Sequence, residues 1–400
     1  MGIIYSILYA LALFIYLPVF IFITKKKGYS PELKDRFVLY QGDYKNCIWF
    51  HCASVGELNV ARPIIEYFKK EREILITVSS PRGKKYAKKV YPFATVRTVP
   101  FDLPFLVNRF IKMHKPSVLI VVEGELWFNL ITVTSKFIPV ISVNTRISPS
   151  SYRVYRKLKP FYKKILNSFS LLIVRTETDR NYLQEFVKQK EKIVMCGDLK
   201  FVSSKGAKTV NINKEGRVVV AGSTHFPEEK IIIKAFQNLK KEFPDLKLVI
   251  APRHLERVSE VEKIVQENNL SCSLRTETDQ IKTDVYILDT VGELSGFYKH
   301  ADAVFVGGTF APVGGHNILE AVLQNRPVVI GPNYHKIKDT VEEIKKTGFL
   351  KIASDEKELE QHIKEFLTEK LPEIDFSQIS ENIYQCYISN IKGAVNGHNR

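Results

Sequence analysis

The stretch CIWFHCASVGEL, residues 47–58, joins a short apolar segment to the start of a helix. Residues 47–53 are mostly apolar and include two aromatic side chains, which predicts a buried strand. The small residues Ala53, Ser54 and Gly56 follow, and Glu57 falls in the first turn of the expected helix. Because small residues at a strand-to-helix turn let a ligand approach the backbone closely, this turn is a candidate binding site.

The same alternation of strand and helix patterns continues through both halves of the chain. Further buried strands are predicted at residues 74–79, 117–123, 140–143 and 171–174, and then at residues 217–221, 246–250, 285–288, 303–306 and 327–330. Amphipathic helical patterns lie between them. This rhythm predicts an α/β protein with two tandem Rossmann-like, doubly wound domains, whose ligands bind beyond the carboxyl ends of the strands.

The expected domain limits follow from this pattern. The apolar periodicity lapses over residues 201–214, which predicts a linker. The last helical stretch has no strand after it and is expected to pack back toward the first domain. We therefore predict four parts: a membrane anchor at 1–27, a first domain at 28–205, a second domain at 206–375 and a C-terminal helix at 376–400.

The first segment has the composition of a membrane anchor. Residues 2–24 carry no charge and are followed by Lys25, Lys26 and Lys27, and a membrane span needs about 20 such residues. A cleaved signal peptide is disfavoured because there is no basic region before the apolar run and no A-x-A site. The positive-inside rule then predicts that the domains lie in the cytoplasm. Pro18 leaves a kinked or shallow insertion open.

The charge of the chain is uneven. Residues 1–200 hold 33 Lys/Arg against 15 Asp/Glu, whereas residues 201–400 hold 26 against 28. The basic first half indicates an anionic partner, either nucleic acid or a phosphorylated lipid, although added solubility is the simpler alternative. Residues 152–164 interleave basic and aromatic side chains. After a membrane anchor, a bilayer-facing patch is the better interpretation of this run, with single-stranded nucleic acid and a solvated helix face as alternatives.

Cysteine and histidine spacing excludes several classes of site. The five cysteines show no paired spacing and are interpreted as reduced thiols. The nine histidines form no ligand pattern, so a structural metal is not expected. No G-x-G-x-x-G follows the first strand of either domain and no G-x-x-x-x-G-K-[ST] occurs, which argues against a dehydrogenase or an ATPase.

In the first domain the candidate site residues follow predicted strands. The helix dipole should keep Glu57 ionised, as a general base must be, although a favourable first-turn residue is the plainer explanation. Glu123 comes directly after a buried strand, where a charge is costly unless it is used or paired. Glu125 is interpreted as a helix-start residue. Asn144-Thr145-Arg146 offers a partner for a carboxylate or phosphate, and Lys200 follows the last strand.

In the second domain the turns favour phosphate and nucleotide. Gly222-Ser223-Thr224-His225 precedes a helix and is a candidate anion site. Arg253, after Pro252, suits bidentate phosphate binding. Gly307 and Gly308 follow another strand and permit close backbone approach. Asn317 and Glu320 open a helix, where Glu320 could reach a ribose hydroxyl, but a capping box explains the pair equally well.

As an ordered set these motifs resemble a known family. The set is HCASVGE at 51–57, EGELW at 123–127, NTR at 144–146, GDLKF at 197–201, APRH at 251–254, GEL at 292–294 and GGHNILE at 314–320. It is similar to the Kdo (3-deoxy-D-manno-oct-2-ulosonic acid) transferases of the glycosyltransferase-B fold. The resemblance implies an inverting transfer from CMP-Kdo to the 6'-hydroxyl of a lipid A precursor at the cytoplasmic face of the inner membrane. It implies no cofactor, no metal and no nucleic-acid partner.

The resemblance also assigns roles by motif. Glu57 would deprotonate the acceptor hydroxyl, and Glu123 and Lys200 would stabilise the transition state. The residues expected to hold CMP are Pro252, Arg253, Gly292, Glu293, Leu294, Asn317, Ile318, Leu319 and Glu320. The contact at 292–294 rests on the resemblance alone. The sequence departs from the usual pattern at Phe128, at Gly124 and at Arg82, which we interpret as variation in acceptor fit.

Two other functions stay open at this point. One is a transferase of the same fold that uses a different nucleotide sugar, such as a UDP-sugar, on another membrane acceptor. The other is a non-catalytic, membrane-tethered protein that binds nucleic acid or lipid, which the basic first half favours. The number of Kdo residues transferred, the seating of acyl chains and the oligomeric state are not encoded in any of these motifs.

Overall fold

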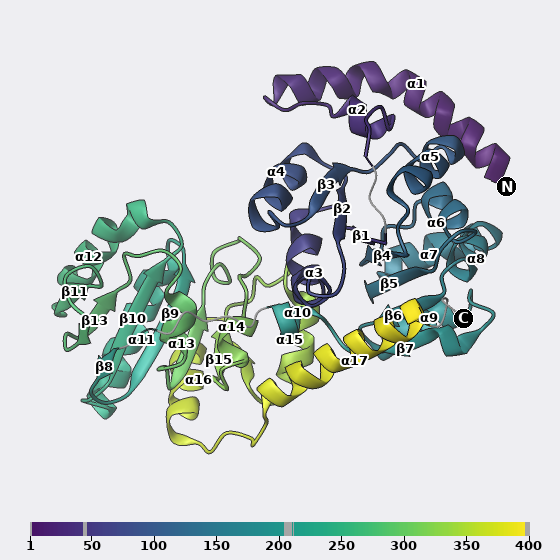
Figure 1. Cartoon of the computed structure of the whole chain (residues 1–400). Helices are drawn as coiled ribbons and strands as arrows, with labels where there is room; N and C mark the ends of the chain where they lie inside the picture. The colour runs from purple at the N-terminus through teal and green to yellow at the C-terminus, as the bar shows by residue number, and fades with distance from the viewer. Residues whose placement is uncertain (1, 43–45, 204–209, 211, 397–400) are drawn as a thin grey trace. The chain divides into compact units, whose positions relative to one another are not determined.

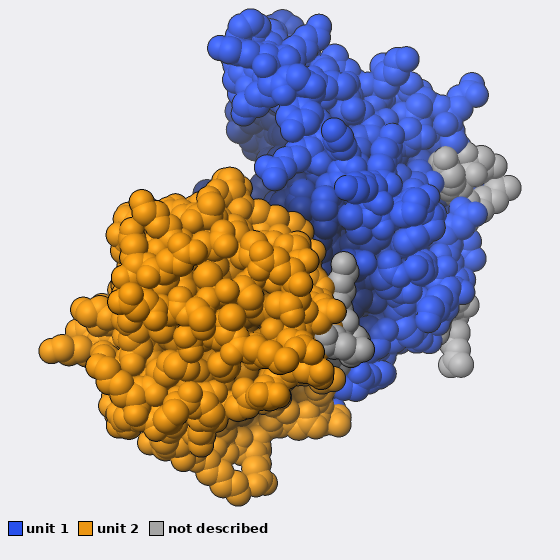
Figure 2. Space-filling view, turned by 90° about the vertical axis from the view of Figure 1, so that its left-hand side faces the viewer, with its two compact units in different colours: residues 1–203, 381–400 blue, residues 204–380 orange. Residues whose placement is uncertain are grey.

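The computed structural model describes residues 2–42, 46–203, 210 and 212–396, and the chain forms two compact units. Unit 1 comprises residues 1–203 and 381–400, and unit 2 comprises residues 204–380 (Figure 2). The predicted boundary at residues 205 and 206, like much of the predicted linker, lies outside the described residues.

Unit 1 is built on a seven-stranded parallel sheet of order β3-β2-β1-β4-β5-β6-β7 (Figure 1). Its strands are β1 (Ile48–His51), β2 (Ile74–Val78), β3 (Thr95–Thr98), β4 (Val118–Val122), β5 (Val140–Thr145), β6 (Leu171–Val174) and β7 (Ile193–Met195). Every residue of β1, β2, β4, β5 and β6 is buried, as expected for parallel strands covered on both faces.

The helices of unit 1 connect these strands or precede them. They are α1 (Gly2–Lys26), α2 (Leu33–Arg36), α3 (Val55–Phe68), α4 (Pro81–Val90), α5 (Pro104–His114), α6 (Phe128–Thr134), α7 (Pro149–Lys157), α8 (Lys159–Asn167), α9 (Glu177–Gln184) and α10 (Lys200–Ser203). The basic stretch at 152–164 is divided between α7 and α8. The break falls at Leu158, because Pro160 stands in the first turn of α8, where its missing N–H and fixed φ suit a helix start.

Unit 2 repeats the architecture with a parallel sheet of order β11-β13-β10-β9-β14-β15-β16. Its strands are β9 (Val218–Thr224), β10 (Lys247–Pro252), β11 (Cys272–Leu274), β13 (Val285–Ile287), β14 (Ala303–Val306), β15 (Val328–Ile330) and β16 (Leu350–Ile352), beside a small pair of β8 (Asn213–Lys214) and β12 (Gln280–Ile281). Its helices are α11 (Glu228–Glu242), α12 (Val258–Glu267), α13 (Leu294–Tyr298), α14 (Leu319–Val322), α15 (Lys338–Lys345) and α16 (Glu356–Thr368). The predicted fold class is confirmed.

The apolar helix α1 lies alongside the rest of unit 1 (Figure 1). Tyr5, Tyr9, Leu13 and Leu17, spaced four residues apart, pack on the core of the unit. Tyr5 also donates a hydrogen bond to Asp102 Oδ2 (2.7 Å). By length and composition α1 could cross a membrane, yet one of its faces is already engaged by the protein.

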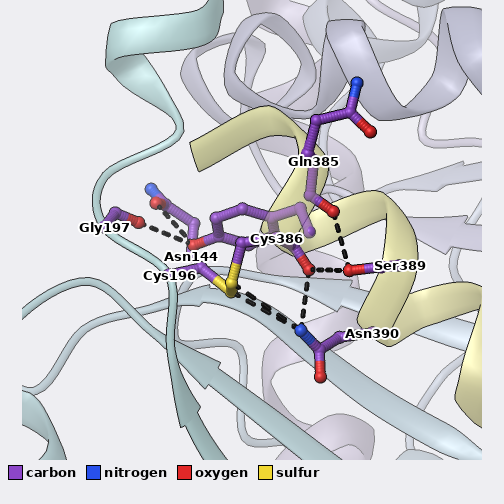
Figure 3. Close-up of a disulfide and its surroundings, with 8 residues drawn as sticks. Asn144, Cys196, Gly197, Gln385, Cys386, Ser389 and Asn390 are labelled. Atoms are coloured by element: carbon purple, nitrogen blue, oxygen red, sulfur yellow. Dashed lines mark hydrogen bonds between the residues drawn. A yellow bond between two sulfur atoms is a disulfide. The ribbon is translucent and has the colours of Figure 1, made fainter. Parts of the chain in front are cut away.

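The C-terminal helix α17 (Phe376–Asn396) starts in unit 2, and from residue 381 onward it belongs to unit 1. There a disulfide joins Cys386 of α17 to Cys196 after β7 (Figure 3). The interpretation of all five cysteines as reduced thiols was therefore wrong for this pair. The two positions lie 190 residues apart, so no local spacing reveals that the fold brings them together. Cys47, Cys52 and Cys272 are free thiols.

Candidate active site

Two of the predicted residues of unit 1, Glu57 and Glu123, follow the two strands at which the strand order reverses. The strand order runs one way from β1 to β3 and the other way from β4 to β7, and ligands of such sheets bind at the carboxyl ends beside this switch point. Glu57 follows β1 and Glu123 follows β4. Burial raises the pKa of the Glu57 carboxyl, and the charges of Glu125 and Glu123 add to this rise, so the three carboxylates lie within electrostatic reach of one another.

Glu57 is held by the start of its own helix. The Ser54 hydroxyl caps α3 by accepting from the Glu57 N–H (3.2 Å), and Glu57 Oε2 accepts from the Ala53 N–H (2.6 Å). Its other oxygen, Oε1, receives only a long bond from the Ser54 hydroxyl (3.3 Å) among the contacts of the described residues. These bonds around the N-cap orient the carboxylate and leave Oε1 as the freer oxygen.

The protonation of Glu57 differs from the sequence expectation. Burial raises the pKa of its carboxyl to about 7, and the charges of Glu125 and Glu123 add to this rise, while the bonds from Ala53 and Ser54 oppose it. The helix dipole was expected to keep Glu57 ionised. Instead, desolvation and like charges outweigh the dipole, so the group exchanges its proton near neutral pH. A carboxyl group with such a pKa is well matched to general-base catalysis.

Glu123 stands in a strained turn after β4. Its φ of 59° lies in the left-handed region, which costs a residue other than glycine about 1–2 kcal/mol and is often retained at functional sites. Its N–H donates to the Val143 carbonyl of the neighbouring β5 (2.9 Å), which fixes the turn. Glu125 is not a helix-start residue, because α6 begins at Phe128; its carboxylate accepts from the Trp127 indole N–H (2.7 Å).

Lys200 is positioned by a network of buried polar residues after β6 and β7. Its N–H donates to Asp198 Oδ1 (2.9 Å), and Asp198 forms a buried ion pair with Arg175 (3.1 Å). The next residue back, Leu199, donates its N–H to Asn144 Oδ1 (2.9 Å). Asn144 is thus a structural residue rather than a ligand for phosphate. The helix α10 that carries Lys200 packs against α3, the helix of Glu57.

In unit 2 the predicted anion site is already occupied by a side chain. Glu228, fully buried in the first turn of α11, accepts from the His225 N–H (2.9 Å). It also accepts from the backbone N–H groups of Gly308, Thr309, Phe310 and Ala311 at 2.8–3.2 Å. The Glu228 carboxylate thus uses donors of both the 222–225 turn and the 307–311 loop, so this turn is not the open anion site that the sequence predicted.

The cationic candidate of unit 2 lies beside that turn. Pro252 ends β10, and the Arg253 N–H donates to the Thr224 carbonyl (3.0 Å). The Arg253 side chain is exposed. Burial raises the pKa of the Glu320 carboxyl, and the hydrogen bond from Asn317 and the charge of Arg253 oppose this rise. Burial and then the charge of His225 lower the pKa of His316, and the charge of Arg253 adds to this effect. Arg253 is therefore close enough to His316 and Glu320 for its charge to act on both.

The other residues predicted to contact the nucleotide differ in burial and in hydrogen bonding. The Asn317 amide donates to Glu320 Oε1 (3.1 Å), and its Oδ1 accepts from the Leu319 N–H (3.2 Å). The N-cap of α14 is Ile318, which makes no side-chain cap bond, so this is not the capping box that the sequence allowed. Ile318 and Leu319 are buried, so any contact with a ligand would come from their backbone. Glu293 pairs with Arg275 (3.2 Å).

The turn at 292–294 adjoins the end of β9. Gly292 has a φ of 86°, a left-handed conformation that glycine adopts without strain. Leu294 and Tyr298 pack so closely on Gly222 that a Cβ there would lie 2.0 Å from the Tyr298 hydroxyl. The nucleotide contact at 292–294, which only the family resemblance predicted, therefore lies next to the turn at 222–225.

Sequence reasoning missed a histidine pair at the same edge. The Nε2 atoms of His225 and His316 lie 2.8 Å apart, and the two rings are stacked at 5.1 Å, with His254 edge-on to His225 at 5.5 Å. Burial, followed by the charge of His225, lowers the pKa of His316 to about 4, and burial also lowers the pKa of His225. Both rings are neutral at pH 7, so one donates an N–H to the other. The residues follow different strands, so only the fold reveals the pair.

Comparisons with known proteins agree with this arrangement. Residues 31–203 match the family model described as 3-deoxy-D-manno-octulosonic-acid transferase (kdotransferase), and residues 207–385 match that of glycosyl transferases group 1. The solved UDP-GlcNAc 2-epimerase of Methanocaldococcus jannaschii superposes with a TM-score of 0.55, covering 86% of this chain and 99% of that one. At 14% identity this likeness shows the fold alone.

Two curated relatives cover most of the chain. A 3-deoxy-D-manno-octulosonic acid transferase of Haemophilus influenzae is 29% identical over 367 residues, which cover 85% of each chain. One of Aquifex aeolicus is 36% identical over 357 residues, which are 88% of this chain and 96% of the relative. With this identity over nearly the whole length of a relative, the chain belongs to the family of 3-deoxy-D-manno-octulosonic acid (Kdo) transferases.

Proposed function

We propose that this Kdo transferase moves Kdo from CMP-Kdo to the 6'-hydroxyl of a lipid A precursor, lipid IVA, with inversion at the transferred sugar and without a metal cofactor. The observation that carries the proposal is the Glu57 carboxyl group, buried beside Glu123 and Glu125 at the switch point of unit 1, with a pKa of about 7. Such a group can take the proton of an attacking hydroxyl at neutral pH.

In this proposal Glu57, Glu123 and Lys200 each have a different role in the transfer. Glu57 removes the proton of the acceptor hydroxyl through its freer Oε1. Glu123, held by its strained turn, stabilises the positive charge that develops on the sugar ring. Lys200, fixed by Asp198 behind it, stabilises the negative charge of the departing phosphate.

Unit 2 would hold the donor. The exposed Arg253 guanidinium offers a bidentate site for the CMP phosphate, and its charge is only partly offset by Glu320. The turn at 292–294 and the backbone at 317–319 lie at the same edge and would hold the nucleoside. Because Arg253 supplies positive charge beside the phosphate, the proposal requires no metal ion. Within the described residues no group of three or more His, Cys, Asp or Glu side chains is arranged to hold one.

The acceptor is an anionic glycolipid, and the surface of unit 1 supports its recruitment at a membrane. The outer face of α1 exposes large apolar side chains that include Ile3, Ile7, Phe14, Ile15, Val19 and Phe22. Its inner face packs on the unit, so we propose that α1 lies in the plane of the bilayer surface rather than crossing it. Lys164 of α8 lines the same hollow as Ile3 and Ile7, which places positive charge beside the apolar face. We propose the cytoplasmic face of the inner membrane as the location.

One assay tests function and location together. Full-length protein is mixed with anionic phospholipid vesicles that contain tetra-acylated lipid IVA, floated, and then supplied with CMP-Kdo. We expect the protein to float with the vesicles and the lipid to gain the mass of Kdo. Protein that remains in the unbound fraction contradicts the membrane placement, and lipid that gains no mass contradicts the proposed acceptor or donor.

Thermal stabilisation tests the donor separately. We expect CMP to raise the Tm more than UMP or UDP does, and Arg253→Ala to abolish this rise. Arg217→Ala is the matched control, because Arg217 precedes β9 at the other end of the sheet, and its exposed ion pair with Asp245 contributes little. Preference for UDP would favour a UDP-sugar transferase. Salt-sensitive binding of DNA or RNA without any effect of CMP would favour a nucleic-acid-binding protein.

A further inference from the structure

A hollow of about 330 Å³ lies between α1 and the body of unit 1. The α1 side is formed by Tyr9, Ala12, Leu13, Tyr16, Leu17 and Phe20, and the opposite side by Arg36, Phe101 and Trp127. Arg36 is the one charged residue of this lining. Its guanidinium lies over the rings of Phe20 and Phe101 and donates to the carbonyls of Ser79 (2.7 Å) and Pro31 (3.3 Å). The hollow is therefore almost wholly apolar.

Trp127 forms a wall between this hollow and a second one. The second, of about 590 Å³, is lined by Gly124 and Glu125 of the turn after β4, by Trp127, and by aromatic side chains that include Tyr5, Tyr155 and Tyr162. The Trp127 ring packs edge-on against Tyr9 of α1, and its indole N–H donates to Glu125. A single side chain thus contacts the membrane-facing helix on one side and the turn of Glu123 and Glu125 on the other.

One hollow is polar and aromatic and the other is apolar, which matches the sugar and the acyl chains of a glycolipid. The second hollow mixes aromatic rings, serine hydroxyls and a carboxylate, a combination that suits a sugar. The first offers hydrocarbon and ring surfaces, and its α1 wall is the inner face of the helix whose outer face exposes apolar side chains. An alkyl chain that leaves the bilayer beside α1 would enter apolar surroundings without crossing water.

We propose that the hollow between α1 and Trp127 holds one fatty-acyl chain of the glycolipid acceptor, while the sugar to be glycosylated occupies the hollow on the other side of Trp127. This inference rests on the proposed function and adds a specificity site for the acylated acceptor. Trp127 would then determine how far a chain enters and where the attached sugar stops relative to Glu123.

The test fills the hollow. Ala12 is exposed but lines the hollow, so Ala12→Phe adds a ring to that lining. Leu11→Phe adds the same ring on the outer face, where Leu11 is 57% exposed and does not line the hollow. We expect Ala12→Phe to raise the KM for tetra-acylated lipid IVA about tenfold, the effect of excluding roughly two methylene groups. The KM for the fully deacylated sugar bisphosphate should stay unchanged, and Leu11→Phe should alter neither value. Ala12→Leu should give a smaller rise in the same direction. Equal changes with both acceptors, or no change with either, overturn the proposal.

Tryptophan fluorescence gives a readout that does not need turnover. Trp49 is fully buried in the core, so a dibrominated stearate should quench Trp127 and leave Trp49 unaffected. We expect lipid IVA to relieve this quenching and Ala12→Phe to prevent it. If the stearate still quenches Trp127 in Ala12→Phe, the hollow takes no acceptor chain. The same conclusion follows if brominated phospholipid quenches Trp127 and lipid IVA does not relieve that quenching. If wild-type protein transfers Kdo to neither acceptor while quenching behaves as expected, the proposed reaction fails and the acyl site stands.

Discussion

Glu57 and Glu228 occupy equivalent places in the two units and have opposite surroundings. Each lies in the first turn of the helix that follows the strand at the switch point, β1 in unit 1 and β9 in unit 2. Both oxygens of Glu228 are bonded, to five backbone N–H groups from two loops. Glu57 receives one short bond from the Ala53 N–H and a long one from Ser54.

The difference shows that the loop beside a carboxylate, rather than its position in the chain, determines its role. In unit 2 the loop at 307–311 passes directly over the helix start. Gly307 permits this approach, because a Cβ there would lie 2.7 Å from Glu228 Oε2. In unit 1 the corresponding turn carries Glu123 and Glu125, which bring negative charge in place of N–H donors. The loop of unit 2 therefore fixes its carboxylate, whereas burial and like charges in unit 1 raise the pKa of the carboxyl group that we propose as the base.

The largest expected effect is the loss of activity on changing Glu57. Glu57→Gln keeps the size of the side chain and an oxygen for the Ala53 N–H, but it cannot accept a proton. We expect kcat/KM for Kdo transfer to fall about 10²- to 10⁴-fold, the usual contribution of a general base, with little change in Tm.

The matched control is the equivalent carboxylate of unit 2. If Glu228→Gln, made in the same background, lowers kcat to the same extent while Glu57→Gln lowers the Tm, the roles assigned here to the two residues are reversed. A folded Glu57→Gln variant that retains substantial turnover removes Glu57 from the mechanism.

The second effect concerns stability. Glu228→Ala leaves five buried N–H donors without their acceptor, and an unsatisfied buried donor costs about 1–3 kcal/mol. Allowing for water that enters the space, we expect a loss of about 3–5 kcal/mol in the free energy of unfolding of unit 2, measured by denaturant titration of the full chain. Glu228→Gln, which keeps one acceptor oxygen, should lose less. A loss below 1 kcal/mol for Glu228→Ala would show that the loop does not depend on the carboxylate.

Much of the fold could be predicted because inner parallel strands are fully buried and therefore carry continuous apolar runs. None of the four edge strands of the two seven-stranded sheets, β3, β7, β11 and β16, received a predicted range. In Thr95–Thr98 buried and partly buried residues alternate, and in Cys272–Leu274 every residue is only partly buried. Without a continuous apolar run, such sequences resemble loops. Edge strands have a neighbour on one side only, and their sequence signal is weaker for that reason.

Candidate site residues could be predicted from the sequence where a single residue directly follows a predicted strand. Glu57, Glu123, Lys200 and Arg253 were all identified by this placement, although their roles stay predictions. What the sequence did not reveal depends on partners that are far apart along the chain. Glu228 meets a loop 80 residues away, His225 meets His316 across 91 residues, and Cys196 meets Cys386 across 190. No spacing rule connects such pairs.

The smallest expected effect is a shift in pH dependence. If Glu57 is the base, as we propose, it acts only when deprotonated, so kcat/KM should rise with pH through an acid limb near 7. Burial is the main cause of the raised pKa, with the charges of Glu125 and Glu123 adding to it; the neighbouring Cys52 thiol stays neutral, since its own pKa is raised well above the usual value. Glu125→Gln removes one of these charges and keeps an oxygen for the Trp127 indole N–H. The ionised form of Glu57 is then less repelled, so its pKa falls and the acid limb moves to lower pH.

Glu66→Gln, on the exposed side of the same helix α3, is the control for this shift. The causes that raise the pKa of Glu57 are burial and the charges of Glu125 and Glu123, so replacing Glu66 should leave the limb in place. An acid limb that stays at the wild-type pH in Glu125→Gln, or moves upward, would mean that the limb reports a group other than Glu57. Glu57 would then no longer be the reactive counterpart of Glu228, and the base would have to be another residue of unit 1.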